Sequence, residues 1–376
     1  MDHTTPVPTA RSLQSAALPP DRRRAPAQGV PRRRTHQWLG GVRIAVDRRL
    51  NHALRLSRGE REDRRWAEAL EEARRFALRP GKRLRPALLL VGFGLATGRS
   101  RIPQGLWSFA AGVEILHAFS LIHDDVADRA DTRRGGPTLH RVLGPGSLGE
   151  NLAVVVGDCL FARALETMLD SRLPRADRAL RHYLRVCRHA ARGQFHDLDL
   201  SRVPLGKVTP AQSLGVARLK TASLGFAAPL VGGALLGGGA QPLCRALARV
   251  GHHLGLAFQI RNDLVGLFGE ADFLGASSDR DLVQGTRTFP LVAAYRRAPR
   301  PGQSEIDDLW SRGIRDRAAV DRARTLVEAY RGRTAAERAV ARACLAAHRV
   351  LDDAIPAGPW RHRLSALITL VYRPLA

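Results

Sequence analysis

Apolar residues recur at helical spacing along almost the whole chain from Trp38 onward, and this pattern constrains the fold more than any other feature. Alternating apolar and polar runs bounded by turn residues, which are typical of strands, are scarce. Turn-forming clusters such as Arg79-Pro80-Gly81 and Gly237-Gly238-Gly239 divide the pattern into roughly ten or more helices. We therefore predict an all-α fold.

The helical pattern has no linker long enough to separate two cores, so we expect one bundle-like domain over residues 37–376. Residues 1–36 are rich in proline and arginine and contain hardly any large apolar side chain. Such a segment cannot bury enough surface to fold, and we expect a disordered tail. An Arg-rich, acid-poor stretch also fits an organellar transit peptide, but it lacks the apolar segment of a secretory signal.

The formal charge of +25 first suggests binding to nucleic acid. Only Lys82, Lys207 and Lys220 are lysines among the 60 cationic residues, and the arginines are spread over most helices. This bias looks like genome composition, and charge alone reads no base sequence. We expect no specific nucleic-acid partner, whereas non-specific attraction to acidic lipid or polymer stays open.

Cys159, Cys187, Cys244 and Cys344 lie far apart, without the close pairs that zinc sites need. We expect core thiols in a reducing compartment, which indicates a cytoplasmic protein. The longest uncharged run, residues 221–242, is broken by Pro229 and several glycines. It predicts a buried core helix and no transmembrane segment.

A cluster of three aspartates, Asp124, Asp125 and Asp128, ends the apolar stretch 109–122. Asp124 and Asp128 fall on one helical stripe with His117, and Asp125 stands just beside it. Carboxylates at the end of a buried helix repel one another unless cations compensate them. The pattern predicts a Mg²⁺ site facing a cavity, and the following Arg133-Arg134 pair suits the other end of a diphosphate.

Two further sequence segments carry cationic side chains at positions where a bound anion would account for their presence. Residues 81–86, Gly-Lys-Arg-Leu-Arg-Pro, begin a helix, where cations oppose the dipole unless an anion binds against them. Lys220-Thr221 offers an ammonium and a hydroxyl within an apolar stretch. The alternatives are a solvated basic turn for the first group and a lysine that reaches the surface for the second.

A second apolar helix, residues 255–270, carries polar groups near its end. Asn262, Gly266 and Glu270 are spaced by four, Asp263 stands beside them, and Gln259 lies one turn before Asp263. We expect this helix to form the facing wall of the same cavity, with a poorer set of metal ligands.

These strings, in this order, resemble the trans-isoprenyl diphosphate synthase (polyprenyl synthetase) family from about Trp38 to Ala376. The matching strings are residues 81–86, the Asp124 motif with Arg133-Arg134-Gly135, Gly157-Asp158, Gly193-Gln194 with Asp197, Lys220-Thr221, and Phe258-Gln259. The resemblance implies an all-α bundle around a deep central cavity, of the isoprenoid synthase type. It also implies allylic diphosphates and isopentenyl diphosphate as substrates, Mg²⁺ as cofactor, and a homodimer.

The resemblance assigns roles residue by residue. Asp124, Asp125 and Asp128 are expected to hold Mg²⁺ that bridges the allylic diphosphate, with Asn262 and Asp263 as the second metal motif. Arg133, Lys220, Thr221 and Gln259 are expected to bind the allylic diphosphate, and Lys82, Arg85, His117 and Arg134 the isopentenyl diphosphate.

Product length is implied by the residues just before the first aspartate motif. A bulky residue five positions before the first aspartate limits elongation in this family, and that residue is Phe119, followed by Ser120. The motif also lacks a two-residue insertion. The pattern is most similar to short-chain geranylgeranyl diphosphate synthases, with a C20 product expected first and a C15 product second.

The second motif departs from the family, and three functions stay open. Two of its usual aspartates appear as Asn262 and Gly266, and two usual lysines as Ala276 and Thr286. The chain is expected to be a prenyl elongase, because its isopentenyl diphosphate pocket is complete. Alternatively, it is a class I terpene cyclase with Asn262, Asp263 and Glu270 as second metal site, or a non-catalytic partner subunit of a synthase.

Overall fold

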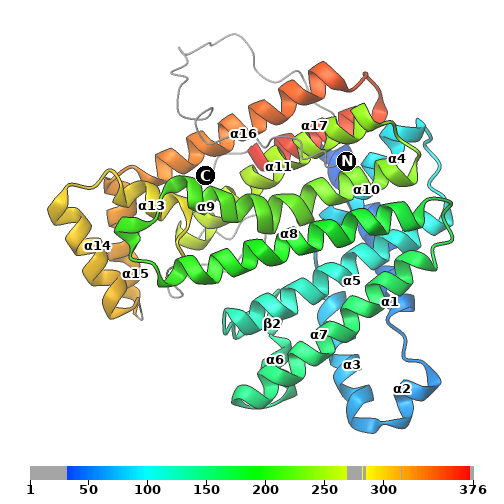
Figure 1. Ribbon diagram of the computed structural model, residues 1–376, viewed down its shortest axis with the longest axis horizontal. Coiled ribbons are helices and arrows are strands. Elements are labelled where there is room, and N and C mark those ends of the chain that lie inside the picture. The colour runs from blue at the N-terminus through cyan, green and yellow to red at the C-terminus, as the bar shows by residue number, and fades with distance from the viewer. Residues whose placement is uncertain (1–31, 269–281, 283–284, 315, 373–376) are drawn as a thin grey trace, which may run out of the picture.

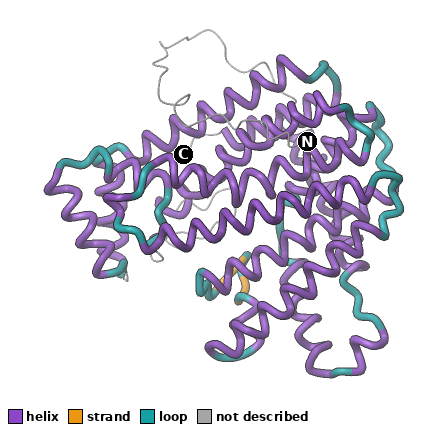
Figure 2. The backbone as a smooth tube through the Cα atoms, viewed as in Figure 1, coloured by secondary structure: helices purple, strands orange, loops and turns teal. Residues whose placement is uncertain are grey.

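The computed structural model describes residues 32–268, 282, 285–314 and 316–372, and within them the fold is all-α, as predicted (Figures 1 and 2). The N-terminal half comprises α1 (Arg32–Ala53), α2 (Arg58–Glu62), α3 (Arg64–Leu78), α4 (Leu84–Thr97), α5 (Gln104–Ala127), α6 (Leu139–Leu143), α7 (Gly146–Leu169) and α8 (Ala176–Arg202). Two-residue strands β1 (Thr132–Arg133) and β2 (Gly136–Pro137) pair antiparallel between α5 and α6.

The C-terminal half continues from a 3₁₀ turn, η2 (Leu205–Lys207). It comprises α9 (Pro210–Ala217), the π-helix η3 (Arg218–Ala227), α10 (Ala228–Leu236), α11 (Gln241–Phe268), α13 (Phe289–Tyr295), α14 (Arg300–Arg312), α15 (Arg317–Ala329), α16 (Gly332–Ala354) and α17 (Pro359–Tyr372). In Figure 1, α8, α10 and α11 run side by side along the long axis, and α13 to α15 gather at one end.

Helix α5 lies in the middle of the fold because its sequence is apolar on every face. Its residues Phe109, Ile115 and Leu116 are buried against neighbouring helices, and its strongest packing partner is α7. A helix that is hydrophobic all round has to be covered on all sides. The acidic motif at its C-terminal end therefore projects from the core and not from a surface helix.

Two helical stretches, Gln104–Ala127 and Pro210–Leu236, are long and apolar enough to cross a membrane by length and composition alone. Their apolar windows are 67% and 78% buried inside the fold. This burial agrees with the prediction that residues 221–242 form core structure.

Helix α1 begins at Arg32, five residues before the boundary expected from the sequence, and Thr35 is 6% exposed. The expected tail therefore includes one helical turn that belongs to the fold. Residues 1–31 lie outside the described residues.

Helices α4 and α10 cross so closely that glycine is needed on both sides. A Cβ on Gly92 would lie 2.0 Å from the carbonyl oxygen of Leu230, and one on Gly233 would lie 2.0 Å from that of Leu89. Backbone cannot yield as a flexible side chain does, so this contact fixes the distance between the two helices.

We predict that Gly233→Val lowers the free energy of unfolding by about 3 kcal/mol or more, because the new side chain separates α4 from α10. Chemical denaturation would measure it. The control is Gly41→Ala on α1, where a Cβ meets nothing within 4 Å. That change should be neutral or stabilising by up to about 1 kcal/mol. Equal stability of Gly233→Val and the natural chain would contradict the crossing argument.

Candidate active site

The bundle encloses a cavity of about 1870 Å³ that brings together nearly all the residues singled out from the sequence. Its walls come from α4, α5, α8, η3, α11 and the β1–β2 hairpin. The predicted residues that line it are Lys82, Arg85, His117, Phe119, Ser120, Asp124, Asp128, Arg133, Arg134, Lys220, Thr221, Gln259, Asn262 and Asp263. The remaining lining is largely apolar, which suits a hydrocarbon substrate.

Lys220 is the cation that compensates the first acidic wall. Its Nζ lies 3.0 Å from Oδ2 of Asp197 and 3.7 Å from Oδ1 of Asp124. Burial works against its ammonium, but Asp124, Asp197 and Asp128 outweigh burial and raise the pKa of Lys220. Burial also disfavours the charged form of Asp124 and raises its pKa, while Lys220 and Arg133 oppose that shift. Asp197 thus belongs to the site, although the sequence marked it only as part of a matching string.

The π-helix explains how Lys220 and Thr221 reach the cavity from an apolar stretch. Within η3 each turn takes in an extra residue, a local widening that is frequent at functional sites. A Cβ on Gly193 would lie 2.7 Å from the backbone nitrogen of Lys220, so α8 approaches η3 at a glycine. The close approach brings Asp197, one turn later on α8, to the lysine.

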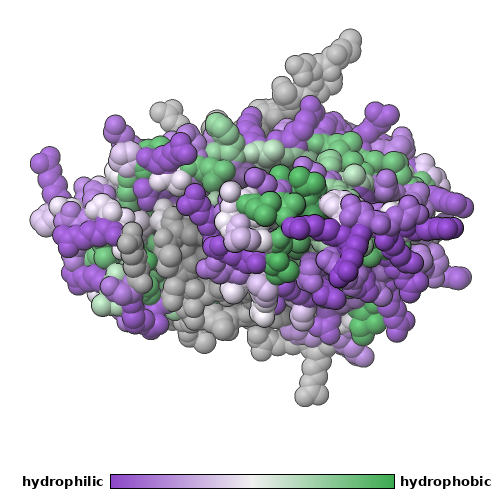
Figure 3. Space-filling view, turned by 90° about the horizontal axis from the view of Figure 1, so that it is seen from below, coloured by the Kyte–Doolittle hydropathy of each residue, from purple (hydrophilic) through white to green (hydrophobic). Residues whose placement is uncertain are grey.

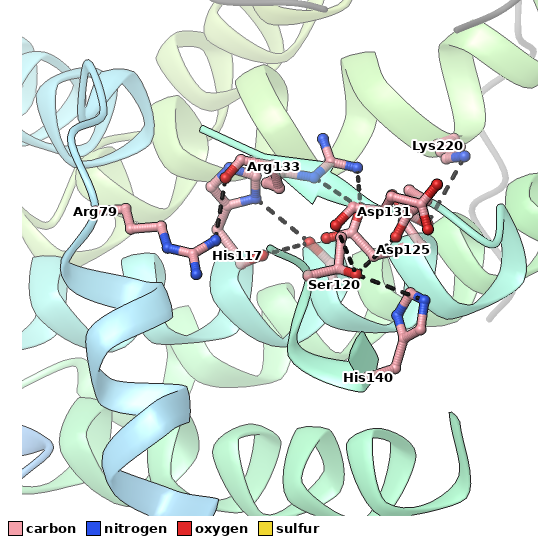
Figure 4. A network of polar contacts seen from close by, with 11 residues as sticks. Arg79, His117, Ser120, Asp125, Asp131, Arg133, His140 and Lys220 are labelled. Carbon is pink, nitrogen blue, oxygen red and sulfur yellow. Dashed lines mark hydrogen bonds and ion pairs between the residues drawn. The ribbon is translucent and has the colours of Figure 1, made fainter. Parts of the chain in front are cut away.

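Asp125 has a different position from the other two aspartates. It is fully buried, does not line the cavity, and accepts a hydrogen bond of 2.7 Å from Nε of Arg133 (Figure 4). The carbonyl of Arg133 in turn accepts a bond of 3.1 Å from Nη1 of Arg79. In the structure Asp125 therefore anchors Arg133 from behind the cavity surface, and its predicted role as a metal ligand stays a prediction.

The described residues contain no group of three His, Cys, Asp or Glu side chains that could hold a metal ion by itself. Mg²⁺ is usually bound by one or two carboxylates, with water and substrate phosphate completing its shell. Asp124 and Asp128 on one wall fit that mode, with Asp263 on the other. Oδ1 of Asn262 also fits, because it is buried and has no hydrogen-bond partner in the described structure.

The facing wall is a hydrogen-bonded chain that links η3 to α11. The Thr221 hydroxyl donates to Oε1 of Gln259 at 2.6 Å, and Nε2 of Gln259 donates to Oδ1 of Asp263 at 2.7 Å. Gly266 also lines the cavity but brings no side chain. Ala276, one altered position of the second motif, and Glu270, expected in the alternative cyclase metal site, lie outside the described residues.

The predicted isopentenyl diphosphate residues form a cationic pocket around a neutral imidazole. Burial, and then Arg85 and Arg134, hold the pKa of His117 well below its usual value. Nη2 of Arg134 lies 3.4 Å from Nε2 of His117. Burial also lowers the pKa of Arg85 to about 10, with Glu114 acting against it. Concentrated positive charge in a buried pocket is what an anionic substrate would neutralise.

Arg83 and Glu114 support this pocket, and the sequence did not single them out. Arg83 is 2% exposed and donates to Glu114 and to Asp47, each at 2.7 Å. Its Nη2 also donates to the carbonyls of Ala77 and Arg79. A buried arginine inside a basic run cannot be told from its exposed neighbours by spacing alone.

One part of the cavity lining, next to the first acidic motif, is a group of three rings. The Phe119 ring lies 4.5 Å from the His123 ring and 5.1 Å from the Phe161 ring, measured between centroids. All three residues line the cavity. Ser120, predicted beside Phe119, also lines the cavity, and its hydroxyl donates to the carbonyl of His117 at 2.8 Å. The structure adds Phe161, on α7, to the residues expected from the sequence.

The polyprenyl synthetase family model matches residues 67–327 of the chain. The geranylfarnesyl diphosphate synthase of Aeropyrum pernix is 35% identical over 234 residues, which cover 61% of this chain and 70% of that protein. The short chain isoprenyl diphosphate synthase of Methanothermobacter thermautotrophicus is 33% identical over 264 residues, covering 69% and 76%.

Solved structures give the same result. The geranylgeranyl pyrophosphate synthase of Corynebacterium glutamicum, complexed with isoprenyl diphosphate and magnesium, has a TM-score of 0.79 and 28% identity, covering 89% of this chain and 99% of that one. The polyprenyl synthase of Caulobacter crescentus, complexed with calcium and isoprenyl diphosphate, has a TM-score of 0.78 and 29% identity, covering 93% and 99%. The cavity, its two walls and these likenesses agree: the chain belongs to the polyprenyl synthetase family.

Proposed function

We propose that this protein is a Mg²⁺-dependent trans-prenyltransferase that condenses an allylic diphosphate with isopentenyl diphosphate to a short-chain prenyl diphosphate, C20 first and C15 second. Family membership and relatives named as geranylgeranyl and farnesyl diphosphate synthases support the reaction class. The observation that carries the proposal is one apolar cavity lined both by the Asp124–Lys220 wall and by the Arg85–His117–Arg134 pocket.

The geometry suits the chemistry that these groups would perform. Bound Mg²⁺ would neutralise charge on the departing diphosphate. Lys220 and Arg133 present cations to the same diphosphate, and electrostatic stabilisation of a leaving group lowers the barrier to breaking the C–O bond. The cationic pocket holds the second substrate close by, and the apolar walls exclude water that would quench an allylic cation.

The cationic pocket favours prenyl elongation over the two alternatives, a terpene cyclase and a non-catalytic partner subunit. Lys82, Arg85, His117 and Arg134 all line the cavity. A cyclase acting on one diphosphate has no use for a second anion pocket. A non-catalytic subunit has no need for either half of the site.

The four cysteines support a reducing compartment, and we propose the cytoplasm as the location. They are free thiols in the structure. Burial raises the pKa of Cys187 to about 11 and that of Cys344 to about 12, so both remain unreactive near neutral pH.

The exposed apolar face of α7 supports a homodimer. Leu148, Val155 and Leu169 are 51%, 56% and 52% exposed, and with Ala162 they recur every seven residues. Such a heptad stripe is typical of helices that pack against another helix. On α8, Leu184, Phe195 and Leu198 are also exposed. Figure 3 shows hydrophobic patches among hydrophilic atoms on the face seen from below.

Charge complementarity points to a second copy as the partner of this face. Five exposed arginines lie on α8 and have no ion-pair partner within the described structure: Arg178, Arg181, Arg185, Arg188 and Arg192. Arg181, Arg185 and Arg188 line the cavity, which leaves Arg178 and Arg192 for contact with a partner. The α7 face carries Asp158 and Glu166, whose side chains are 66% and 68% exposed, although each lies near a cation of its own chain, His123 at 3.5 Å and Arg163 at 3.8 Å. In a two-fold dimer, Arg178 and Arg192 of each copy can meet the acidic groups of the other.

We predict that Asp124→Ala abolishes turnover but keeps the fold, because Asp124 faces the cavity and removing it costs no core packing. Incubation with Mg²⁺, isopentenyl diphosphate and geranyl or farnesyl diphosphate, followed by mass spectrometry, should yield longer diphosphates only with the natural chain. Geranylgeranyl diphosphate alone should yield no hydrocarbon.

The matched control is Asp131→Ala, since Asp131 is exposed and pairs with Arg141 outside the cavity. It should retain activity. If the natural chain forms hydrocarbon from geranylgeranyl diphosphate, it is a cyclase. If it forms no product in either mixture, it is a partner subunit.

We predict that Phe119→Ala shifts the products to longer chains, because removing the ring opens the cavity toward Phe161. Product lengths would be read by mass spectrometry. Phe195→Ala, which removes an exposed ring outside the cavity lining, should leave them unchanged. An unchanged distribution for Phe119→Ala would show that another part of the cavity lining limits chain length.

We predict that Val155→Asp produces monomers, because a carboxylate in the heptad stripe would be desolvated on association. Light scattering coupled to size-exclusion chromatography would measure the mass. Leu345→Asp on α16, where the side chain is 51% exposed, should not change it. A natural chain that is monomeric at micromolar concentration would refute the dimer.

A further inference from the structure

Residues 286–288 line the cavity, and the first of them is a position where the second motif lost a cation. Thr286 stands where the family has a lysine, and Thr286, Arg287 and Thr288 all line the cavity. Gly266 and Asn262, the altered residues of the second motif, line the same cavity. This wall therefore has no lysine at position 286, but the guanidinium of Arg287 lies next to that position.

Arg287 is held in place by backbone carbonyls. Its Nε and Nη2 donate to the carbonyl of Val203 at 3.3 and 3.2 Å, and its Nη1 donates to that of Gly285 at 2.9 Å. Val203 caps α8, which carries Gln194 and Asp197 in the cavity lining. Three of the five N–H groups are thus used for anchoring, and two remain for a ligand.

The charge of Arg287 has no close carboxylate in the part of the chain that the structure describes. Asp307 acts on it electrostatically, but no ion pair within 4.0 Å forms among the described residues. Two other residues of the cavity lining have unsatisfied polar atoms. Oγ1 of Thr288 and both amide atoms of Gln194 are buried and make no hydrogen bond to described residues. Buried polar atoms of this kind normally have a partner. A bound anion could accept hydrogen bonds from the Thr288 hydroxyl and from Nε2 of Gln194, but it would not satisfy Oε1 of Gln194.

We propose that Arg287 binds the diphosphate of the allylic substrate and supplies the cation that Thr286 does not. This inference rests on the proposed function. The second motif has lost two carboxylates and two lysines, so its net charge is little changed, but no lysine remains at these positions to bind phosphate. The anchored guanidinium of Arg287 provides a cation beside one of them. A guanidinium also offers two parallel N–H groups to phosphate oxygens, which an ammonium cannot do.

The test is steady-state kinetics on Arg287→Gln. The KM for geranyl or farnesyl diphosphate should rise about tenfold, as expected for loss of one charge-assisted hydrogen bond, while the KM for isopentenyl diphosphate stays unchanged. The matched control is Arg296→Gln. Arg296 likewise donates through Nε and Nη2 to a carbonyl, that of Val208, at 3.2 and 2.8 Å, but does not line the cavity. Its KM values should match those of the natural chain.

Rescue separates ligand binding from structural support. Thr286→Lys in the Arg287→Gln background restores a cation but cannot rebuild the bonds to Val203, so it should return the allylic KM toward the natural value. An allylic KM within twofold of the natural one in Arg287→Gln, or failure of the rescue in a folded double variant, would overturn the inference. If Arg287→Gln does not fold, Arg287→Lys decides: its ammonium keeps the charge but loses the parallel N–H pair, so the allylic KM should rise while the KM for isopentenyl diphosphate stays unchanged, and an unchanged allylic KM would overturn the inference.

Failure of the proposed function has a separate signature. It would appear as absence of prenyl product from the natural chain, before any variant is compared. A natural chain that elongates normally while Arg287→Gln does the same rejects only the role of Arg287.

Discussion

The ion pair between Arg83 and Glu114 is the interaction on which the cationic pocket depends. Both residues are almost completely buried, and removing one partner of a buried pair typically costs about 3–5 kcal/mol. Arg83 also adopts a left-handed backbone conformation, with φ of 49°. The pair thus holds a strained turn that begins α4, and this turn places Lys82 and Arg85 on the cavity. Glu114 lies one turn before His117 on α5, so the same pair ties the two helices together.

The sequence predicted the all-α class and most of the cavity lining because both depend on local patterns. Apolar spacing marks α5 as buried, and charged residues at the end of a buried helix need a cavity, a ligand or an ion-pair partner. His117, Asp124 and Asp128 were placed correctly on one stripe for this reason.

Three features could not be predicted because they depend on which helices meet. Asp125 stands next to Asp124 in the sequence, yet its carboxylate points to Arg133 behind the cavity surface, and only the β1–β2 hairpin brings that arginine there. Phe161 is one apolar residue among many on α7 until α5 packs against it. The π-helix that directs Lys220 and Thr221 inward has no sequence signal as clear as a proline or a cap.

The Asp125–Arg133 bond has a consequence for binding entropy. An arginine free in solvent loses about 0.5–1.5 kcal/mol of side-chain entropy when a ligand immobilises it. Arg133 is already fixed at its Nε by Asp125 and at its carbonyl by Arg79. Its rotamer is therefore selected when the chain folds and not when substrate arrives. A diphosphate that enters the cavity meets a pre-organised donor, so more of the binding energy remains for the step in which the C–O bond breaks.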